Sequence, residues 1–373
     1  MTMLADAGLT QPRMGVDPVS VVDAPLPSGA VVVGIDIGGT KTAAMVVDGA
    51  DEILGRAERS TDRHAPLRVA VEVARAALAA AGVTDGSLGA VGVAVPGDVD
   101  ARTGTVRLAV NLEARDLPLG ALLAGMLGVP CYVEHDARAA ASWLAARPGA
   151  TGDLAYLSIG TGIAAGVVLD GQPLTGDNGL AGEIGHCVAD PDGALCPCGL
   201  RGCLEAVASG PAVARAAQAA LDVGEPSLLR DGPADSVITA EAVYAAAARG
   251  DLLALQVTSA AAEAIARAVR SLVLSYGVST VVIGGGPSRA GDAFTRPLHR
   301  ALANERSASA LVRRAFLSTV EVLGADAQPT CWGAITVARH ASPDIRDGQR
   351  EEAGQARQVD RSTGRVAFRG PIG

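Results

Sequence analysis

Two carboxylates, a histidine and three cysteines crowd into residues 182–205, which read GEIGHCVADPDGALCPCGLRGCLE. Cys196, Cys198 and Cys203 are two and five residues apart in a run rich in glycine and proline, so three thiolates can surround one ion. His186 can supply the fourth ligand of a tetrahedral Cys₃His zinc site. A set of buried free cysteines is the alternative. Disulfides are not expected, because nothing in the chain indicates export to an oxidising compartment.

Glu183 and Glu205 flank this cysteine cluster and have a different chemistry. Together with His186, they can accept hydrogen bonds from the hydroxyl groups of a polyol. A zinc ion behind them would fix the loop that carries them without taking part in a reaction. His186 would then bind zinc through one ring nitrogen and the polyol through the other.

A further carboxylate, Asp136, lies in the segment VEHDARAAA, where a strand gives way to a helix. It can accept the proton of a substrate hydroxyl that attacks a phosphoryl group. The alternative is an ordinary helix N-cap, a position that Asp favours. His135 either contacts a substrate or packs in the core. Asn111 follows an apolar run and either binds a sugar hydroxyl or forms a turn.

An internal repeat indicates two related Gly-rich hairpins. Residues 35–49 (IDIGGTKTAAMVVDG) align without gaps on residues 157–171 (LSIGTGIAAGVVLDG), and six of fifteen positions are identical. Backbone amides in such turns can approach an anion closely, and threonine adds a donor. Two facing turns could therefore hold a polyphosphate, with Lys41 adding charge and Asp36 holding Mg²⁺. The turn residues are Gly38, Gly39 and Thr40 in one hairpin, and Gly160, Thr161 and Gly162 in the other.

The elements that must position these residues alternate between strand and helix, which predicts an α/β fold of two domains. We expect strands at 30–37, 43–47, 90–95, 130–133 and 280–283, and helices at 67–81, 136–146 and 251–276. A turn of Gly284, Gly285 and Gly286 follows the last strand. Residues 1–29 and 342–373 have the composition of a disordered leader and tail.

Composition and charge exclude some partners. The net charge of −9 argues against a nucleic-acid surface, which needs clustered Lys and Arg. We expect no membrane span, because no apolar run approaches about twenty residues. The N-terminus lacks the pattern of a signal peptide, so the prediction is a cytoplasmic protein.

Five of these segments, in this order, closely resemble the ROK family of bacterial sugar kinases and repressors, and most of all its glucokinase branch. They are DIGGTK (36–41), VAVPGDVD (93–100), GEIGH (182–186), CPCGLRGCLE (196–205) and VVIGGG (281–286). The resemblance runs from about residue 31 to residue 341. One position departs from the family pattern, because its kinases usually carry Asn where this chain has His135.

The resemblance implies two actin-like, ribonuclease-H-like ATPase domains flanking a cleft. Residues 30–136 would form a small domain, completed by a C-terminal helix at about 327–341, and residues 137–326 a large domain with the zinc-binding loop. It implies ATP, Mg²⁺ and a structural Zn²⁺ as cofactors, a sugar as substrate and a homodimer as the assembly.

The resemblance also implies roles for the candidate residues. Asp136 would be the catalytic base. The sugar would be bound by Asn111, His135, Asp136, Glu183, His186 and Glu205. Zinc would be held by His186, Cys196, Cys198 and Cys203. ATP would be bound by Asp36, Gly38, Gly39, Thr40, Lys41, Gly160, Thr161, Gly162, Gly284, Gly285 and Gly286, the last three near the adenosine.

The leading hypothesis is therefore an ATP-dependent hexose kinase of glycolysis that converts glucose to glucose 6-phosphate. One alternative is a kinase for another hexose or for an N-acetylated hexosamine. The other is a sugar-responsive ROK repressor. A repressor needs a helix-turn-helix, normally before the first hairpin, and only about thirty proline-containing residues precede that hairpin.

Overall fold

The structure, a computed structural model, describes residues 29–83, 85–150, 152–231, 237–315, 319–324 and 326–341. The expected leader and tail lie outside these residues, apart from Gly29, which is in a turn. The strands are β1 (Val31–Ile37), β2 (Lys41–Val47), β3 (Ile53–Ser60), β4 (Leu88–Val95), β5 (Asp98–Asp100), β6 (Thr105–Ala109), β7 (Ala114–Leu117), β8 (Cys131–His135), β9 (Leu154–Ile159), β10 (Ile163–Leu169), β11 (Gln172–Pro173), β12 (Thr280–Gly285) and β13 (Thr319–Val322). The α-helices are α1 (Pro66–Ala80), α2 (Leu119–Leu127), α3 (Asp136–Ala146), α4 (Leu204–Ala208), α5 (Gly210–Asp222), α6 (Ala240–Ala248), α7 (Leu252–Tyr276), α8 (Asp292–Ala308), α9 (Ala310–Ala315) and α10 (Pro329–Ala341).

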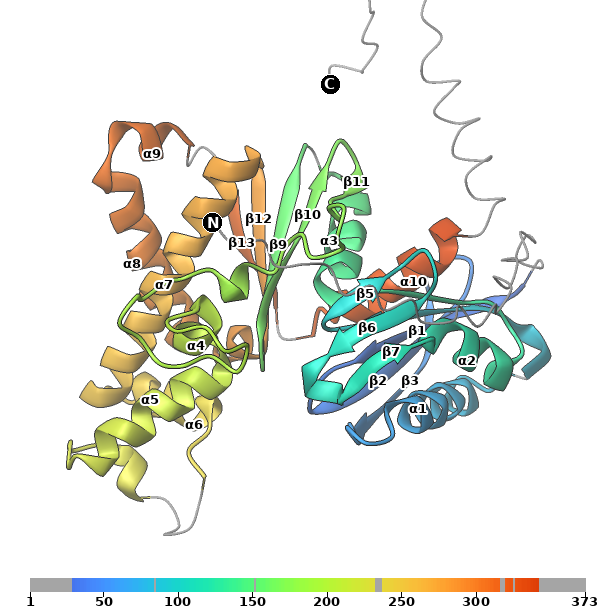
Figure 1. The fold of residues 1–373 in the computed structure, drawn as a ribbon, viewed down its shortest axis with the longest axis horizontal. Helices are drawn as coiled ribbons and strands as arrows, with labels where there is room; N and C mark the ends of the chain where they lie inside the picture. The colour runs from blue at the N-terminus through green and yellow to red at the C-terminus, as the bar shows by residue number, and fades with distance from the viewer. Residues whose placement is uncertain are drawn as a thin grey trace, which may run out of the picture.

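Two five-stranded sheets have the same topology, which agrees with the two related hairpins indicated by the repeat, and the mixture of strands and helices confirms the α/β fold class. Their strand orders are β3-β2-β1-β4-β8 and β11-β10-β9-β12-β13. In each sheet the first three strands pair antiparallel and the last two join in parallel. The two sheets stand beside one another in Figure 1, with β1–β2 and β9–β10 as equivalent hairpins. A separate antiparallel sheet, β5-β6-β7, lies over the first.

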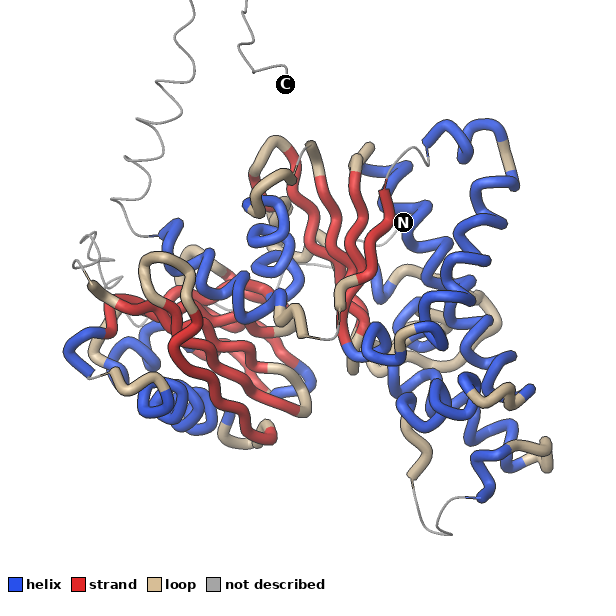
Figure 2. Tube along the Cα trace, turned by 180° about the vertical axis from the view of Figure 1, so that it is seen from behind, coloured by secondary structure: helices blue, strands red, loops and turns tan. Residues whose placement is uncertain are grey.

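Helices cover both faces of each sheet. The first sheet packs on α1 and α2 on one face and on α10 on the other. The second sheet packs on the bundle of α4 to α8 on one face and on α3 on the other. Figure 2 shows the resulting layers, with most of the helices on the side of the second sheet that faces away from the first sheet. The two sheets are joined through α3 and α10, which cross between them.

Backbone contacts make this crossing close. A Cβ atom added to Gly333 of α10 would lie 2.2 Å from the carbonyl carbon of Ala139 in α3. A Cβ on Gly92 of β4 would lie 1.7 Å from the carbonyl oxygen of Ala334. Only glycine fits at such distances, so α10 lies directly on the strands and on α3. The stacked indoles of Trp143 and Trp332, 6.0 Å apart, extend this contact.

Most element predictions are confirmed with small shifts at their ends. The helix expected at 136–146 is α3 with the same bounds, and the C-terminal helix expected near 327–341 is α10. The expected Gly-rich turn differs, because β12 continues through Gly285 and a 3₁₀ helix begins at Gly286.

One helix, α7, is long and apolar enough to cross a membrane by length and composition alone. Among the described residues this one helix passes a test of length and composition, with a mean hydropathy of 1.3 over its most apolar window. Half of that window is buried inside the protein. The buried side includes Ile265, Val269 and Leu272 in the core behind the second sheet, so α7 packs as a core helix.

Candidate active site

A cavity of about 970 Å³ lies between the two hairpins and gathers most of the residues singled out in the sequence. Its lining includes Asp36, Gly38, Gly39, Thr40, Lys41, Asn111, His135, Asp136, Gly160, Thr161, Gly162, Glu183, His186, Cys198, Glu205, Gly285 and Gly286. Three of the predicted residues do not line it. Cys196 and Cys203 are buried behind it, and a Cβ on Gly284 would lie 2.7 Å from the Tyr156 hydroxyl.

The first hairpin turn is closed by its own backbone. The Gly38 amide donates to the carbonyl oxygen of Lys41 at 2.9 Å, and the Thr61 hydroxyl donates to the carbonyl oxygen of Gly38 at 2.7 Å. The sequence predicts that Lys41 adds positive charge beside a phosphate, and the structure gives this charge a partner. Its ammonium group forms an ion pair with Glu58 on β3. An incoming anion would therefore have to compete with this carboxylate.

Asp36, the penultimate residue of β1, lines the same cavity as Asp136. Burial raises the pKa of Asp36, and the charge of Asp136 raises it further. Lys41 lowers it in part, and the net pKa is about 7. Two carboxylates that repel each other in this way favour the arrival of a cation or of a ligand that carries one.

The second hairpin turn is braced by a residue that the sequence had assigned to sugar binding. Glu205, the second residue of α4, accepts a hydrogen bond from the Ile163 amide at 3.0 Å through Oε2. A Cβ on Gly162 would lie only 2.7 Å from this oxygen, so a larger residue there would have to displace the Glu205 side chain. Glu205 therefore joins the cysteine-rich loop to the hairpin as well as lining the cavity.

Asp136 is the first residue of α3, and its side chain is 26% exposed to the cavity. Its Oδ1 accepts a hydrogen bond from the Ala137 amide at 2.6 Å. The carboxylate thus sits at the positive end of the helix dipole, which stabilises its charge. The structure places it between the two hairpins, as a base for a phosphoryl acceptor would need to be.

His135 lies directly beside this carboxylate and is almost completely buried. Its Nε2 is 3.4 Å from Asp136 Oδ1 and 3.4 Å from Glu183 Oε1. Burial alone lowers the pKa of His135, but Asp136 and Glu183 raise it by more, so the net pKa is raised. Burial raises the pKa of Glu183, but His135, His186 and Arg138 together lower it by more, so its net pKa is lowered.

His135 Nδ1 is buried without a hydrogen-bond partner among the described residues. A buried polar atom of this kind costs about 1–3 kcal/mol. The ring is therefore placed for the contacts of Nε2, at a cost on its other side.

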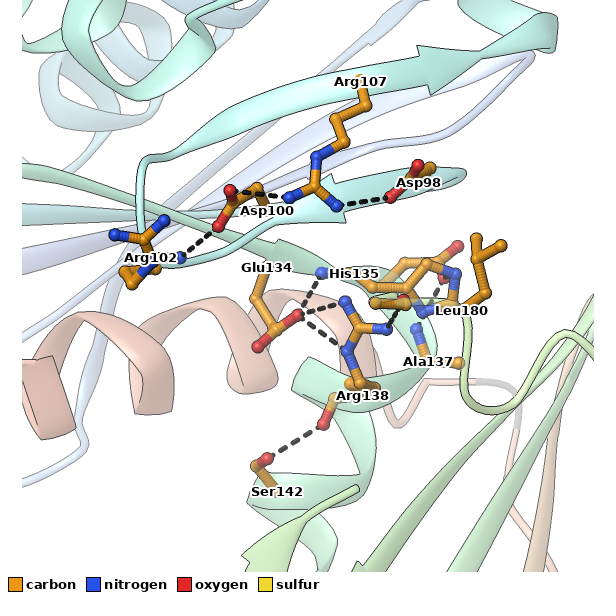
Figure 3. Close-up of polar contacts among 12 residues, drawn as sticks. Asp98, Asp100, Arg102, Arg107, Glu134, His135, Ala137, Arg138, Ser142 and Leu180 are labelled. Atoms are coloured by element: carbon orange, nitrogen blue, oxygen red, sulfur yellow. Dashed lines mark hydrogen bonds and ion pairs between the residues drawn. The ribbon is translucent and has the colours of Figure 1, made fainter. Parts of the chain in front are cut away.

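A buried ion pair next to these residues was missed in the sequence. Arg138 Nε and Nη2 contact Glu134 Oε1 at 2.9 Å, and Arg138 Nη1 donates to the carbonyl oxygen of Gly179 at 2.7 Å (Figure 3). Glu134 also accepts from the His135 amide at 2.7 Å. The pair ties the start of α3 to the loop that leads to Glu183. Its only signal was the spacing of four residues between opposite charges across a strand–helix boundary.

The β5–β6 hairpin was missed as well, and it forms part of the cavity wall. Arg107 on β6 contacts Asp100 at 2.8 Å and Asp98 at 3.6 Å (Figure 3). Leu108 and Asp98 line the cavity. Asn111 follows β6 in a 3₁₀ helix and is exposed, with its Cβ 3.5 Å from the position of a Cβ on Gly39. It lies at the rim beside the first turn.

Four side chains behind the cavity can hold one metal ion. The ligand atoms of His186, Cys196, Cys198 and Cys203 all lie within 4.8 Å of one another. Two pairs are closer, with His186 Nδ1 3.8 Å from Cys196 Sγ, and Cys198 Sγ 3.7 Å from Cys203 Sγ. The edge of a tetrahedron of thiolates at the usual Zn–S distance is about 3.8 Å, so the donor set and its spacing fit zinc.

The two ring nitrogens of His186 face different groups. Nδ1 faces the thiols, whereas Nε2 faces the cavity and is 4.0 Å from Glu183 Oε2. One imidazole can therefore bind metal on one side and a ligand on the other, as the sequence analysis required.

Comparison with known proteins gives the family. A family model described as ROK family matches residues 32–335. The chain belongs to the ROK family. This confirms the resemblance read from its segments, and the fold is accordingly the actin-like ATPase fold of ROK sugar kinases.

Three similar proteins are informative. The chain is 35% identical over 275 residues to a glucokinase of Halalkalibacterium halodurans, covering 71% of this chain and 83% of that protein. It is 36% identical over 261 residues to an N-acetylmannosamine kinase of Citrobacter koseri, covering 67% and 81%. A ROK family glucokinase from Streptomyces griseus, solved in complex with glucose and AMPPNP, superposes with a TM-score of 0.72 at 29% identity, covering 83% of this chain and 100% of that one.

Proposed function

We propose that this protein is an ATP-dependent hexose kinase that transfers the γ-phosphoryl group of ATP to the 6-hydroxyl of glucose. The observation that carries the proposal is the placement of Asp136 between two glycine hairpins, next to a cluster of hydrogen-bonding side chains. The relatives named glucokinase support the choice of glucose.

One part of the cavity would bind ATP and Mg²⁺, and another would bind the sugar. The turns of β1–β2 and β9–β10 offer backbone amides to the phosphates of ATP. Asp36 would receive the Mg²⁺ that accompanies ATP, and this would relieve its repulsion with Asp136. Gly285 and Gly286 leave room for the adenosine at the far end of the same cavity.

The sugar would lie against Asp136, Glu183, His186 and Glu205. Asn111 lies at the rim, where it can bind a sugar hydroxyl. Asp136 would take the proton of the attacking hydroxyl, and positioning of the two substrates supplies most of the remaining rate enhancement. The carboxylates orient the sugar by accepting hydrogen bonds from its other hydroxyls.

We propose that His186, Cys196, Cys198 and Cys203 hold a structural zinc. The ion would supply rigidity to the loop of Glu183 and Glu205 and would take no part in the transfer. His186 then presents Nε2 to the sugar in a fixed tautomer.

We also propose two domains that close on the cavity, residues 30–136 with α10 and residues 137–326. The common topology of the two sheets supports this division. We further propose a homodimer in the cytoplasm, which sedimentation analysis and cell fractionation would test.

N-acetylmannosamine is the second candidate substrate, because a relative with that activity is as similar as the glucokinases are. The acceptor is best identified by ADP release over a panel of glucose, mannose, fructose, N-acetylglucosamine and N-acetylmannosamine. We expect the largest kcat/KM with glucose. ADP release that no sugar stimulates would refute the kinase assignment.

A further inference from the structure

His135 lies between two carboxylates of the proposed active site, those of Asp136 and Glu183. Its Nε2 is equally distant, 3.4 Å, from the carboxylate of Asp136 and from that of Glu183. Asp136 comes from α3 and Glu183 from the loop after β11, so the imidazole links two segments that are distant in the sequence. Both facing atoms are acceptors, so Nε2 must carry a hydrogen.

The charges around the ring favour its protonated form. Asp136 and Glu183 face Nε2, and Glu134 on β8 binds the His135 amide at 2.7 Å. The nearest cation is Arg138, which is occupied by Glu134 and by the carbonyl oxygen of Gly179. His135 is the one of these groups that lies between both carboxylates, whereas Glu183 also faces His186 Nε2 at 4.0 Å.

Fold stability does not account for this residue. The ring is buried, its Nδ1 has no partner among the described residues, and an apolar side chain would avoid that cost. The two ion-pair contacts of the His135 ring, with Asp136 and Glu183, are both with cavity-lining carboxylates.

We propose that His135 is a positioning residue whose protonated imidazole holds Asp136 and Glu183 in one arrangement, and so couples sugar affinity to pH. This inference rests on the proposed sugar kinase function. Below the pKa of His135 the imidazolium separates the two carboxylates and fixes both. As the pH rises through that pKa the charge is lost, the carboxylates repel each other, and Glu183 moves from its sugar-binding position.

The test is sugar binding by titration calorimetry without nucleotide, from pH 5.5 to 8.5, so that ATP ionisation plays no part. The probe is glucose, or the panel hexose with the largest kcat/KM. For the wild type we expect Kd to rise by up to about tenfold per pH unit above the pKa of His135. In buffers of different ionisation enthalpy, binding in that range should take up protons.

Two variants replace the imidazole with a neutral donor, His135→Gln and His135→Asn. We expect either one to bind sugar with a Kd that is less dependent on pH and with no proton uptake. Below pH 6 its Kd should be at least about threefold weaker than that of the wild type. His299→Gln, the same change at an exposed position on α8, is the matched control and should keep the wild-type profile.

The outcomes separate this inference from the function on which it rests. Wild-type protein that phosphorylates and binds a sugar, with no proton uptake or with uptake unchanged in both variants, would overturn the role of His135 alone. Wild-type protein with neither sugar binding nor sugar-stimulated ADP release would overturn the kinase assignment and this inference together.

Discussion

The substitution Asp136→Asn tests the base directly. It replaces one oxygen of a carboxylate with an NH₂ group of almost the same size. The amide oxygen can still accept from the Ala137 amide, so the start of α3 should stay folded. The amide cannot accept a proton from the attacking hydroxyl, whereas its oxygen, in the place of Oδ1, would still face the Nε2–H of His135 at 3.4 Å.

The magnitude follows from the role of a general base. Such a group contributes about 10²–10⁴-fold to the rate, which corresponds to about 2.7–5.4 kcal/mol of barrier. We expect kcat for the hexose to fall by that factor. Sugar binding should remain measurable, because Glu183, Glu205 and His186 still line the cavity.

The assay is sugar-stimulated ADP release, with calorimetry for sugar affinity in the same preparation. Asp292→Asn is the matched control, because Asp292 is also the first residue of a helix, α8, but is exposed and pairs with Arg296. That variant should retain wild-type kcat. Turnover of Asp136→Asn within a few-fold of wild type would refute the assignment of the base.

Three further predictions concern the metal, the packing and the response to acid. Elemental analysis should find one zinc per chain, and Cys198→Ser should lose both the metal and most of the sugar affinity. Cys187→Ser, a change at an exposed cysteine outside the metal cluster, should keep both. Active, metal-free protein would contradict this prediction. Gly92→Ala should lower the unfolding free energy in urea by about 1–3 kcal/mol or more, because its Cβ meets a carbonyl of α10, whereas Gly125→Ala, with open space around it, should leave the value equal or higher. Asp251 caps α7, and hydrogen bonds from backbone amides lower its pKa against the opposing effect of burial. The contribution of Asp251 to the free energy of unfolding, about 1 kcal/mol, is therefore present above its unfolded-state pKa and is lost as the pH falls through its lower folded-state pKa. Asp251→Asn should flatten the acid limb of the curve of unfolding free energy against pH. An unchanged acid limb would count against the cap.

The sequence predicted those parts of the site that depend on local pattern. The hairpins were found because one pattern occurs twice, and the repeat corresponds to equivalent strands in two sheets of equal topology. Asp136 was placed correctly at a strand–helix boundary. The Cys196, Cys198 and Cys203 spacing, with His186, is realised as a compact cluster.

Contacts between distant segments could not be predicted in the same way. The ion pair of Lys41 with Glu58 depends on the pairing of β2 with β3, and neither residue alone indicates it. The bond of Arg138 to Gly179 spans 41 residues and depends on where a loop lies against α3. The bond of Glu205 to the Ile163 amide similarly spans 42 residues. Sequence spacing carries no information on such tertiary contacts.

The position of α10 also has a consequence for the order in which the protein acquires its fold during synthesis. One face of the first sheet, with Val32, Met45 and Ala90, is covered by Cys331 and Ile335 of α10, about 240–300 residues further along the chain. Until that helix leaves the ribosome, the earliest strands would present an open apolar surface. The N-terminal half should therefore be a client of chaperones for most of translation, and it should become protease-resistant only when the last helix docks.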